Sequence, residues 1–172
     1  MHGVLRLSRN AKRERDGYFL RAESYFNVAT QIEELDRDRE PGFVPPPIGP
    51  AYGAASLHEQ SHGESFLALA TKRLRGNGLY IFDEPEAALS PSRQLALLKV
   101  IDGLVRRRGS QLIVATHSPI LMAYPDATIY RLDGDGIAPI DYEATEHFQI
   151  TRDFLAHRGR FFKHLFHDED AE

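Results

Sequence analysis

Two adjacent acidic residues, Asp83 and Glu84, follow the apolar run 79–82. Burying an ionised carboxylate without a partner is costly, and burying two together is worse. A divalent cation removes much of that cost. Magnesium prefers hard oxygen ligands and keeps several waters, so one carboxylate can hold it while the other orients or deprotonates a water. The pair therefore indicates metal-assisted phosphoryl transfer, and the alternative is an acidic helix cap or a solvated strand end.

A second apolar run, residues 111–116, leads into His117 and Ser118. In a doubly wound sheet, chemistry gathers beyond the carboxyl ends of the strands, and two strand ends can be neighbours. His117 could then hydrogen-bond a terminal phosphate or an attacking water. A lone histidine is more often a capping or packing residue, but its place after an apolar strand, in the same sequence as Asp83 and Glu84, favours the functional interpretation.

Residues 61–65 stand at an expected helix start. The backbone N–H groups, a serine hydroxyl and the helix dipole there would bind an anion. Because Ser61 and Glu64 are three residues apart, a capping box is the alternative, and both descriptions can hold at once.

The elements that must position these residues alternate between strand and helix, which predicts an α/β fold with a parallel sheet. We expect strands at 17–22, 79–82 and 111–116, and helices from Ser24 to about Leu35, at 61–75 and from Ser90–Pro91 to Gly109. A short helix from Ser118, a hairpin at 128–142 and a helix at 145–166 should follow. Residues 37–56 contain five prolines and read as a linker.

Composition excludes several classes of protein. The chain has 172 residues, 42% hydrophobic and 27% charged, with a net charge of −4, which is typical of one globular domain and argues against a broad basic surface. It contains no cysteine, so disulfides, thiolate metal sites and cysteine nucleophiles are excluded. No apolar stretch approaches the roughly 20 residues of a membrane span, and no signal peptide is visible. We expect a cytoplasmic protein.

Four segments together resemble the ATPase domain of the ABC superfamily, in its branch of cytoplasmic AAA-type ATPases related to chromosome-maintenance and DNA-repair proteins. Residues 60–64 (QSHGE) resemble the signature motif, 79–84 (LYIFDE) the Walker B strand, 87–90 (AALS) the D-loop, and 115–118 (ATHS) the switch-histidine loop. All four stand in the family's order. The resemblance spans about residues 60–119.

This resemblance implies a site that binds ATP and Mg²⁺ between two facing subunits. Asp83 would support the metal, Glu84 would act as general base, and His117 would sense the terminal phosphate. Glu23 would stand where the Q-loop residue contacts the metal, in a segment, 19–36, that is also similar to this branch.

The signature and D-loop residues Ser61, Gly63, Glu64 and Ser90 would contact the nucleotide from the facing subunit. Two of the family's positions differ here. His62 replaces a glycine, which narrows the room for close approach of the backbone to phosphate. Ser90 replaces the D-loop aspartate, which weakens the expected contacts across the dimer.

The sequence contains no P-loop of the form Gly-x-x-x-x-Gly-Lys-Ser/Thr, and none of its four lysines follows a glycine. In the family this loop precedes the signature motif. We therefore expect the C-terminal part of an ABC-type ATPase domain, incomplete at its N-terminal side, with a small helical lobe, a hairpin and a C-terminal helix. Its divisions would be residues 17–75, 76–142 and 143–172. Its sheet should lack the strand that carries the P-loop.

Three functions follow from these observations. The first is an ATPase half-site whose P-loop comes from a missing part or from a homo- or heterodimeric partner. The second is a non-catalytic module that pairs with an intact ATPase and regulates it. The third is nucleic-acid binding through residues 9–15 and 106–108, although charge runs are usually solvated surface.

Overall fold

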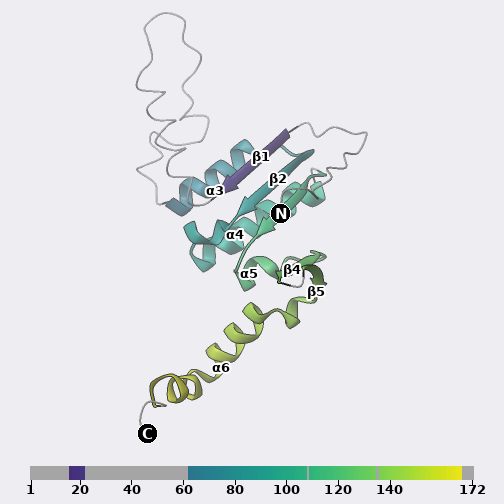
Figure 1. Ribbon diagram of the computed structural model, residues 1–172. Coiled ribbons are helices and arrows are strands. Elements are labelled where there is room, and N and C mark those ends of the chain that lie inside the picture. The colour runs from purple at the N-terminus through teal and green to yellow at the C-terminus, as the bar shows by residue number, and fades with distance from the viewer. Residues whose placement is uncertain (1–15, 22–61, 108, 135, 168–172) are drawn as a thin grey trace, which may run out of the picture.

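The computed structural model describes residues 16–21, 62–107, 109–134 and 136–167. The helix expected from Ser24 and the proline-rich segment 37–56 lie outside these residues. Figure 1 shows a layer of strands and helices, followed by a hairpin and a long C-terminal helix.

Three strands form a parallel sheet in the order β1–β2–β3. These strands are β1 (Asp16–Arg21), β2 (Gly78–Asp83) and β3 (Gln111–Ala115). The continuous apolar runs in β2 and β3 are typical of strands in parallel sheets, which usually have both faces covered. The predicted α/β class with a parallel sheet is confirmed.

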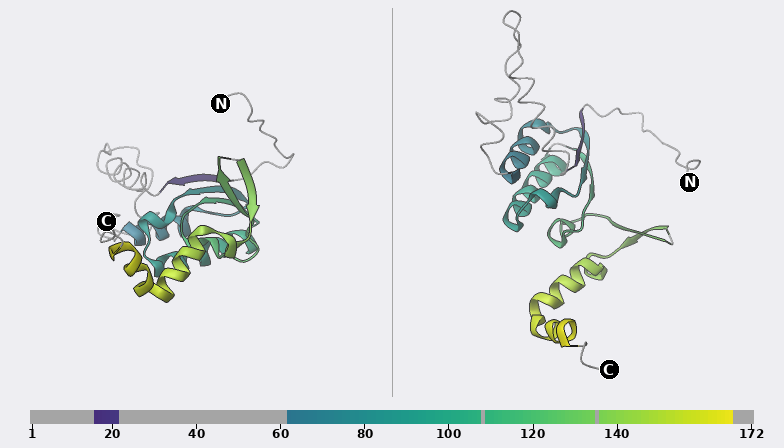
Figure 2. Two further views of the ribbon diagram at one scale, coloured as in Figure 1. Left: turned by 60° about the horizontal axis from the view of Figure 1, so that its bottom comes forward. Right: turned by 60° about the vertical axis from the view of Figure 1, so that its left-hand side comes forward.

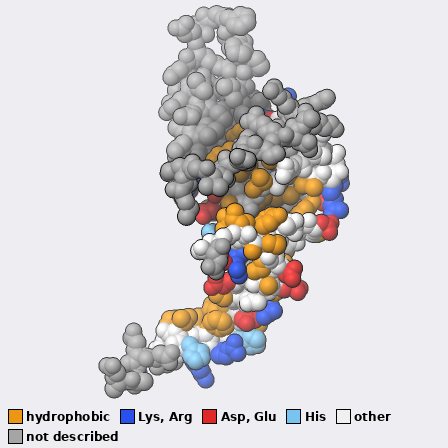
Figure 3. All heavy atoms as spheres, turned by 45° about the vertical axis from the view of Figure 1, so that its right-hand side comes forward, with side chains coloured by type: hydrophobic (Ala, Val, Ile, Leu, Met, Phe, Trp, Pro, Cys, Tyr) orange, Lys and Arg blue, Asp and Glu red, His pale blue; other side chains and the backbone are white. Residues whose placement is uncertain are grey.

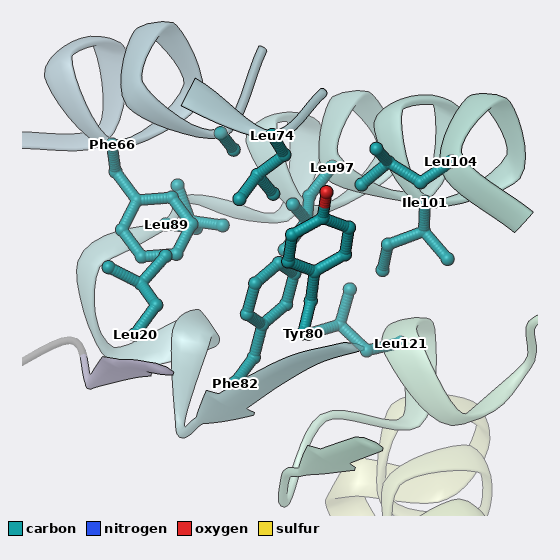
Figure 4. Close-up of a cluster of buried hydrophobic side chains, with 11 residues drawn as sticks. Leu20, Phe66, Leu74, Tyr80, Phe82, Leu89, Leu97, Ile101, Leu104 and Leu121 are labelled. Atoms are coloured by element: carbon teal, nitrogen blue, oxygen red, sulfur yellow. The ribbon is translucent and has the colours of Figure 1, made fainter. Parts of the chain in front are cut away.

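Two helices cover one face of this sheet, as the right-hand view of Figure 2 shows. Helix α3 spans His62–Arg73 and α4 spans Pro91–Asp102, after which Gly103–Arg107 continue as a π-helical turn. Their apolar residues recur at helical spacing and so lie on the side that meets the sheet. Figure 4 shows the resulting core, which includes Phe66, Leu74, Tyr80, Phe82, Leu97, Ile101 and Leu104.

The opposite face of the sheet presents apolar side chains to solvent. Phe19, Ile81 and Ile113 are aligned in register across the three strands. Phe19 is 61% exposed and Ile113 is 50% exposed. Within the described sheet β3 is also an edge strand, so its outer backbone groups pair with no described strand. A bare apolar face beside an open edge is unusual for a parallel sheet.

The C-terminal part begins with the short helix α5 (Pro119–Met122). The hairpin β4 (Ile129–Asp133) and β5 (Gly136–Ile140) follows, then the 3-10 turn Tyr142–Ala144 and helix α6 (Glu146–His167). The predicted hairpin and C-terminal helix are thus present. Figure 3 shows basic and histidine side chains along one side of α6 and hydrophobic ones along the other.

The helix predicted to run to Gly109 changes geometry earlier than expected. Helix α4 ends at Asp102, and Gly109 adopts a left-handed conformation with φ 58°. Arg106 does not form part of a free basic patch, because its guanidinium pairs with Asp102 at 2.7 Å and with Asp126 at 3.4 Å. No helix among the described residues is long and apolar enough to cross a membrane.

Asp16 ties the start of β1 to the loop before β2. Its carboxylate accepts hydrogen bonds from Arg73 at 3.0 Å, from the Tyr80 hydroxyl at 2.9 Å and from the Arg75 N–H at 3.3 Å. Burial alone would raise the pKa of Asp16, but these hydrogen bonds outweigh it and the pKa is lowered. Burial and the neighbouring carboxylate raise the pKa of Tyr80.

Candidate active site at the ends of two strands

The carboxyl ends of β2 and β3 bring Glu84 and His117 together. Asp83 and Ala115 are register partners, and the Glu84 N–H donates to the Ala115 carbonyl at 2.9 Å. Beyond this last rung, His117 Nε2 lies 3.6 Å from Glu84 Oε1. Both side chains are substantially exposed, His117 by 71% and Glu84 by 49%, so a ligand can reach them.

Glu84 has a backbone conformation that is uncommon for its residue type. Its φ and ψ are 47° and 50°, in the left-handed region. The other described non-glycine residues with positive φ are Asn77 and Asp126, whose short polar side chains tolerate this region. Glu84 also precedes Pro85, and a residue before proline normally prefers extended geometry. Strain of this kind at a strand end is typical of functional sites.

Asp83 is paired with an arginine from the neighbouring strand. Arg21 and Asp83 are register partners on β1 and β2, and Arg21 Nε lies 3.3 Å from Asp83 Oδ2. The Asp83 side chain is 34% exposed and faces the bare side of the sheet. The sequence pattern indicates Asp83 as a metal ligand but does not indicate Arg21, because the pairing depends on the register of β1.

Glu86 holds the loop that carries His117. One carboxylate oxygen accepts from the His117 N–H at 2.6 Å, and the other accepts from the Thr116 hydroxyl at 2.7 Å. The Thr116 hydroxyl in turn accepts from the Ser118 N–H at 3.0 Å. Glu86 therefore fixes the β3 end to the turn after β2. The sequence pattern does not indicate this site residue.

A buried polar contact also holds the loop after β3, which carries His117. The Ser118 hydroxyl donates to the side-chain oxygen of Gln94, and the Gln94 amide donates to the Leu89 carbonyl at 3.1 Å. Ser118 Oγ also caps α5 by accepting from the N–H groups of Ile120 and Leu121. Both polar side chains are buried, so these bonds satisfy groups that would otherwise be costly.

The second ring nitrogen of His117 contacts a residue from the C-terminal helix. His117 Nδ1 lies 3.0 Å from His147 Nε2, and the ring centroids are 5.1 Å apart. His147 belongs to the first turn of α6. Nothing in the sequence pattern singled it out, since the contact depends on how α6 packs against α5.

The remaining predicted site residues are less closely connected with this pair. Ser90 is at the N-cap position of α4, as expected, but its side chain does not cap the helix and instead contacts the Ser92 hydroxyl at 3.1 Å. Gly63 and Glu64 lie in the first turn of α3, of which only the backbone is described. Ser61 and Glu23 lie outside the described residues.

The carboxylates of Asp83 and Glu84 suit Mg²⁺, which keeps several water ligands, better than a metal ion whose ligands are all protein side chains. No group of three or more metal-ligating side chains is present among the described residues. Mg²⁺ usually takes one or two carboxylates, several waters and phosphate oxygens. The partly exposed carboxylates of Asp83 and Glu84 fit that requirement. To bind the metal, Asp83 would either break its ion pair with Arg21 or use its other carboxylate oxygen.

Residues 50–123 match the model of a family described as an AAA domain, putative AbiEii toxin, Type IV TA system. The matched residues include α3, the strands β2 and β3 and the Glu84–His117 pair, but not β1 or α6. Over this segment the chain is similar to AAA-type ATPase domains. Comparisons with curated proteins and with solved structures gave no match.

Proposed function

We propose that the chain forms half of an ATP-hydrolysing site, in which Glu84 and His117 act on the terminal phosphate of Mg²⁺-bound ATP. The single observation that carries this proposal is the contact between Glu84 and His117 at the ends of adjacent parallel strands. The similarity of residues 50–123 to AAA-type ATPase domains supports the same chemistry.

In the proposed reaction, Glu84 orients a water and accepts its proton. The water oxygen forms a bond to the terminal phosphorus, and the bond from that phosphorus to the bridging oxygen breaks, which releases ADP and phosphate. His117 donates a hydrogen bond from Nε2 to a terminal phosphate oxygen, where negative charge must be stabilised. Glu84, in a left-handed backbone conformation, directly follows the end of β2, and its carboxylate lies 3.6 Å from the His117 ring.

Asp83 would hold the magnesium, directly or through a water. A bound Mg²⁺ would neutralise charge on the phosphates. Arg21 holds the Asp83 carboxylate in place and partly compensates its charge. Ser61 and Gly63, next to or within the first turn of α3, are proposed to contact the nucleotide of a facing subunit.

The phosphates also need a P-loop, which this sequence does not contain. Two surfaces of the described fold are uncovered: the face around Phe19 and Ile113, and the edge of β3. This supports the view that the described fold lacks one strand–loop–helix unit, the unit that would carry the P-loop. The helices α3 and α4 lie on one face while the chain proceeds from β1 to β3. A right-handed crossover from a strand beside β3 back to β1 would put its helix on the other face. One such unit would cover both features.

The proposed function is tested on the complex rather than on the chain alone. The tagged chain is expressed from its own locus, and the purified complex is searched for a subunit or segment with a Gly-x-x-x-x-Gly-Lys-Ser/Thr loop. In that complex Glu84→Gln should retain ATP binding and lower turnover by about 10²–10⁴-fold, the usual contribution of a general base. Unchanged turnover would remove Glu84 from this role.

A matched control is Glu143→Gln, a change of the same type at an exposed glutamate in the turn before α6. It should leave both binding and turnover unchanged. A complex that contains a P-loop subunit but whose turnover depends only on that subunit's own residues would favour the alternative, a non-catalytic regulatory module.

A further inference from the structure

Contacts made by its neighbours Tyr142, Thr145 and Phe148 hold His147 beside the Glu84–His117 pair. The Thr145 hydroxyl caps α6 by accepting from the Phe148 N–H at 3.3 Å, and Thr145 is buried. The Tyr142 hydroxyl donates to the Pro119 carbonyl at 3.0 Å, and the Tyr142 and Phe148 rings lie 4.7 Å apart. The start of α6 is thereby fixed to the segment that follows His117.

The donor and acceptor roles of the two imidazoles depend on their tautomers, and the Glu84 carboxylate on the far side of His117 favours one of the arrangements. A neutral imidazole carries its proton on one nitrogen and accepts at the other. An ionised Glu84 carboxylate can accept but not donate, and its negative charge, 3.6 Å from His117 Nε2, favours a proton on that nitrogen. His117 Nδ1 then has a free lone pair, so the 3.0 Å contact requires His147 Nε2–H to donate.

We propose that His147 is a positioning residue, which donates from Nε2 to Nδ1 of His117 and so keeps the His117 proton on Nε2. In that tautomer the Nε2–H of His117 faces Glu84 and can donate to an anion bound at the ends of β2 and β3. This inference rests on the proposed function for the identity of the anion, a terminal phosphate. His147 lies outside the residues that match the family model, so the contact adds a component from the C-terminal helix.

The tautomer can be measured directly on the whole chain with ¹⁵N-labelled histidine. Long-range ¹⁵N–¹H spectra recorded well above the ordinary imidazole pKa of about 6.5 report which nitrogen of His117 is protonated. In the wild type the Nε2–H form should dominate. In His147→Leu, which has no donor, the signals should shift towards a mixture of tautomers. In His147→Gln, whose amide N–H can replace the donor, the Nε2–H form should be retained.

A purely structural role for His147 would not produce this pattern. Unchanged backbone amide shifts in β2 and β3 show that each variant keeps its fold. A wild-type His117 protonated on Nδ1, or a tautomer that is the same in His147→Leu as in the wild type, would overturn the proposal. If Leu and Gln variants behave alike, donation by residue 147 is also excluded.

A second readout uses the complex with the P-loop subunit. His147→Leu should lower kcat about tenfold, as loss of an orienting partner does at other sites, while the KM for ATP changes less than about twofold. His147→Gln should restore most of kcat. The two proposals fail differently. If only the proposed function is wrong, Glu84→Gln leaves turnover unchanged, whereas His147→Leu still shifts the His117 tautomer. Without the role of His147, turnover still depends on Glu84 but the tautomer does not depend on residue 147.

Discussion

Glu86 Oε1 lies 2.6 Å from the backbone nitrogen of His117 and so joins the turn after β2 to the loop after β3. The same carboxylate accepts from the Thr116 hydroxyl. His117 therefore owes its place beside Glu84 to a third residue that is not itself expected to meet the substrate.

Replacement of Glu86 by alanine should loosen this loop without unfolding the sheet. The loss of a charge-assisted hydrogen bond should speed hydrogen exchange at the His117 amide by roughly tenfold, equivalent to about 1.4 kcal/mol. Hydrogen–deuterium exchange followed by NMR measures this for single amides. Glu143→Ala is the control, and equal protection of His117 in both variants would show that Glu86 does not hold the loop.

The carboxylate of Asp16 should make the fold sensitive to acid. Its pKa is lowered, so its contribution to the free energy of unfolding is complete above the ordinary value near 3.9 and is lost as pH falls through the folded value. Asp16→Asn should therefore be less stable than the wild type at neutral pH, and the difference should shrink in acid. Urea unfolding at a series of pH values measures it.

The matched control for Asp16→Asn is Asp126→Asn. Asp126 has a side chain that is 87% exposed, and its surface ion pair should contribute little to stability. If the stability difference between Asp16→Asn and the wild type does not change with pH, the contacts of Asp16 with Arg73 and Tyr80 do not favour its ionised form.

Gly78 should not tolerate even a methyl group. A Cβ at this position would lie 2.5 Å from the Asp16 carbonyl and 2.9 Å from the Tyr80 ring. Gly78→Ala should lower the free energy of unfolding by about 2–3 kcal/mol, because the pairing of β1 with β2 must shift. Chemical denaturation monitored by circular dichroism gives the value.

Gly103→Ala is the control for this substitution. Gly103 has helical dihedral angles, and no neighbouring atom lies within 4 Å of an added Cβ. The change should be neutral or stabilising by up to about 1 kcal/mol. Similar losses at positions 78 and 103 would contradict the close approach of β1 to Gly78.

The open edge of β3 should be the surface through which the isolated chain associates. Ile113→Lys adds a charge to the bare face of this edge strand, and charged side chains on edge strands oppose pairing with another chain in natural sheets. It should reduce self-association in sedimentation experiments and weaken binding of the P-loop subunit. The control, Leu155→Lys, changes a residue on α6 that is 71% exposed. If only Leu155→Lys reduces association, the contact surface is α6 and not the sheet.

The strand ends of the site could be predicted from the sequence because their signals are local. The apolar runs before Asp83 and His117 identify strands of the parallel sheet, although β3, expected to be buried, has one exposed face and, within the described sheet, an open edge. The helix between the two runs favours a parallel pairing. Their ends then meet at one edge of the sheet, which is why the 3.6 Å contact between Glu84 and His117 agrees with the expected neighbourhood.

The supporting residues could not be predicted in this way. Arg21 reaches Asp83 only through the register of β1 against β2, and no local pattern sets that register. His147 depends on the packing of α6 against α5, which involves residues far apart in the sequence. Glu86 had a usable signal, since it follows Pro85 within the turn after the carboxylate pair, but its partners lie at the end of another strand.

The central claim is that Glu84 and His117 serve an ATP whose P-loop this sequence lacks. Binding and hydrolysis of Mg²⁺-ATP, measured for the purified chain and for its complex with a P-loop subunit, test it most directly. We predict that the chain alone binds Mg²⁺-ATP with a Kd of about 1 mM or weaker, because it lacks the P-loop that would supply most of the affinity for the phosphates. We also predict turnover in the complex that Glu84→Gln lowers by about 10²–10⁴-fold. Micromolar binding by the isolated chain, or turnover that Glu84→Gln leaves unchanged, would contradict the claim.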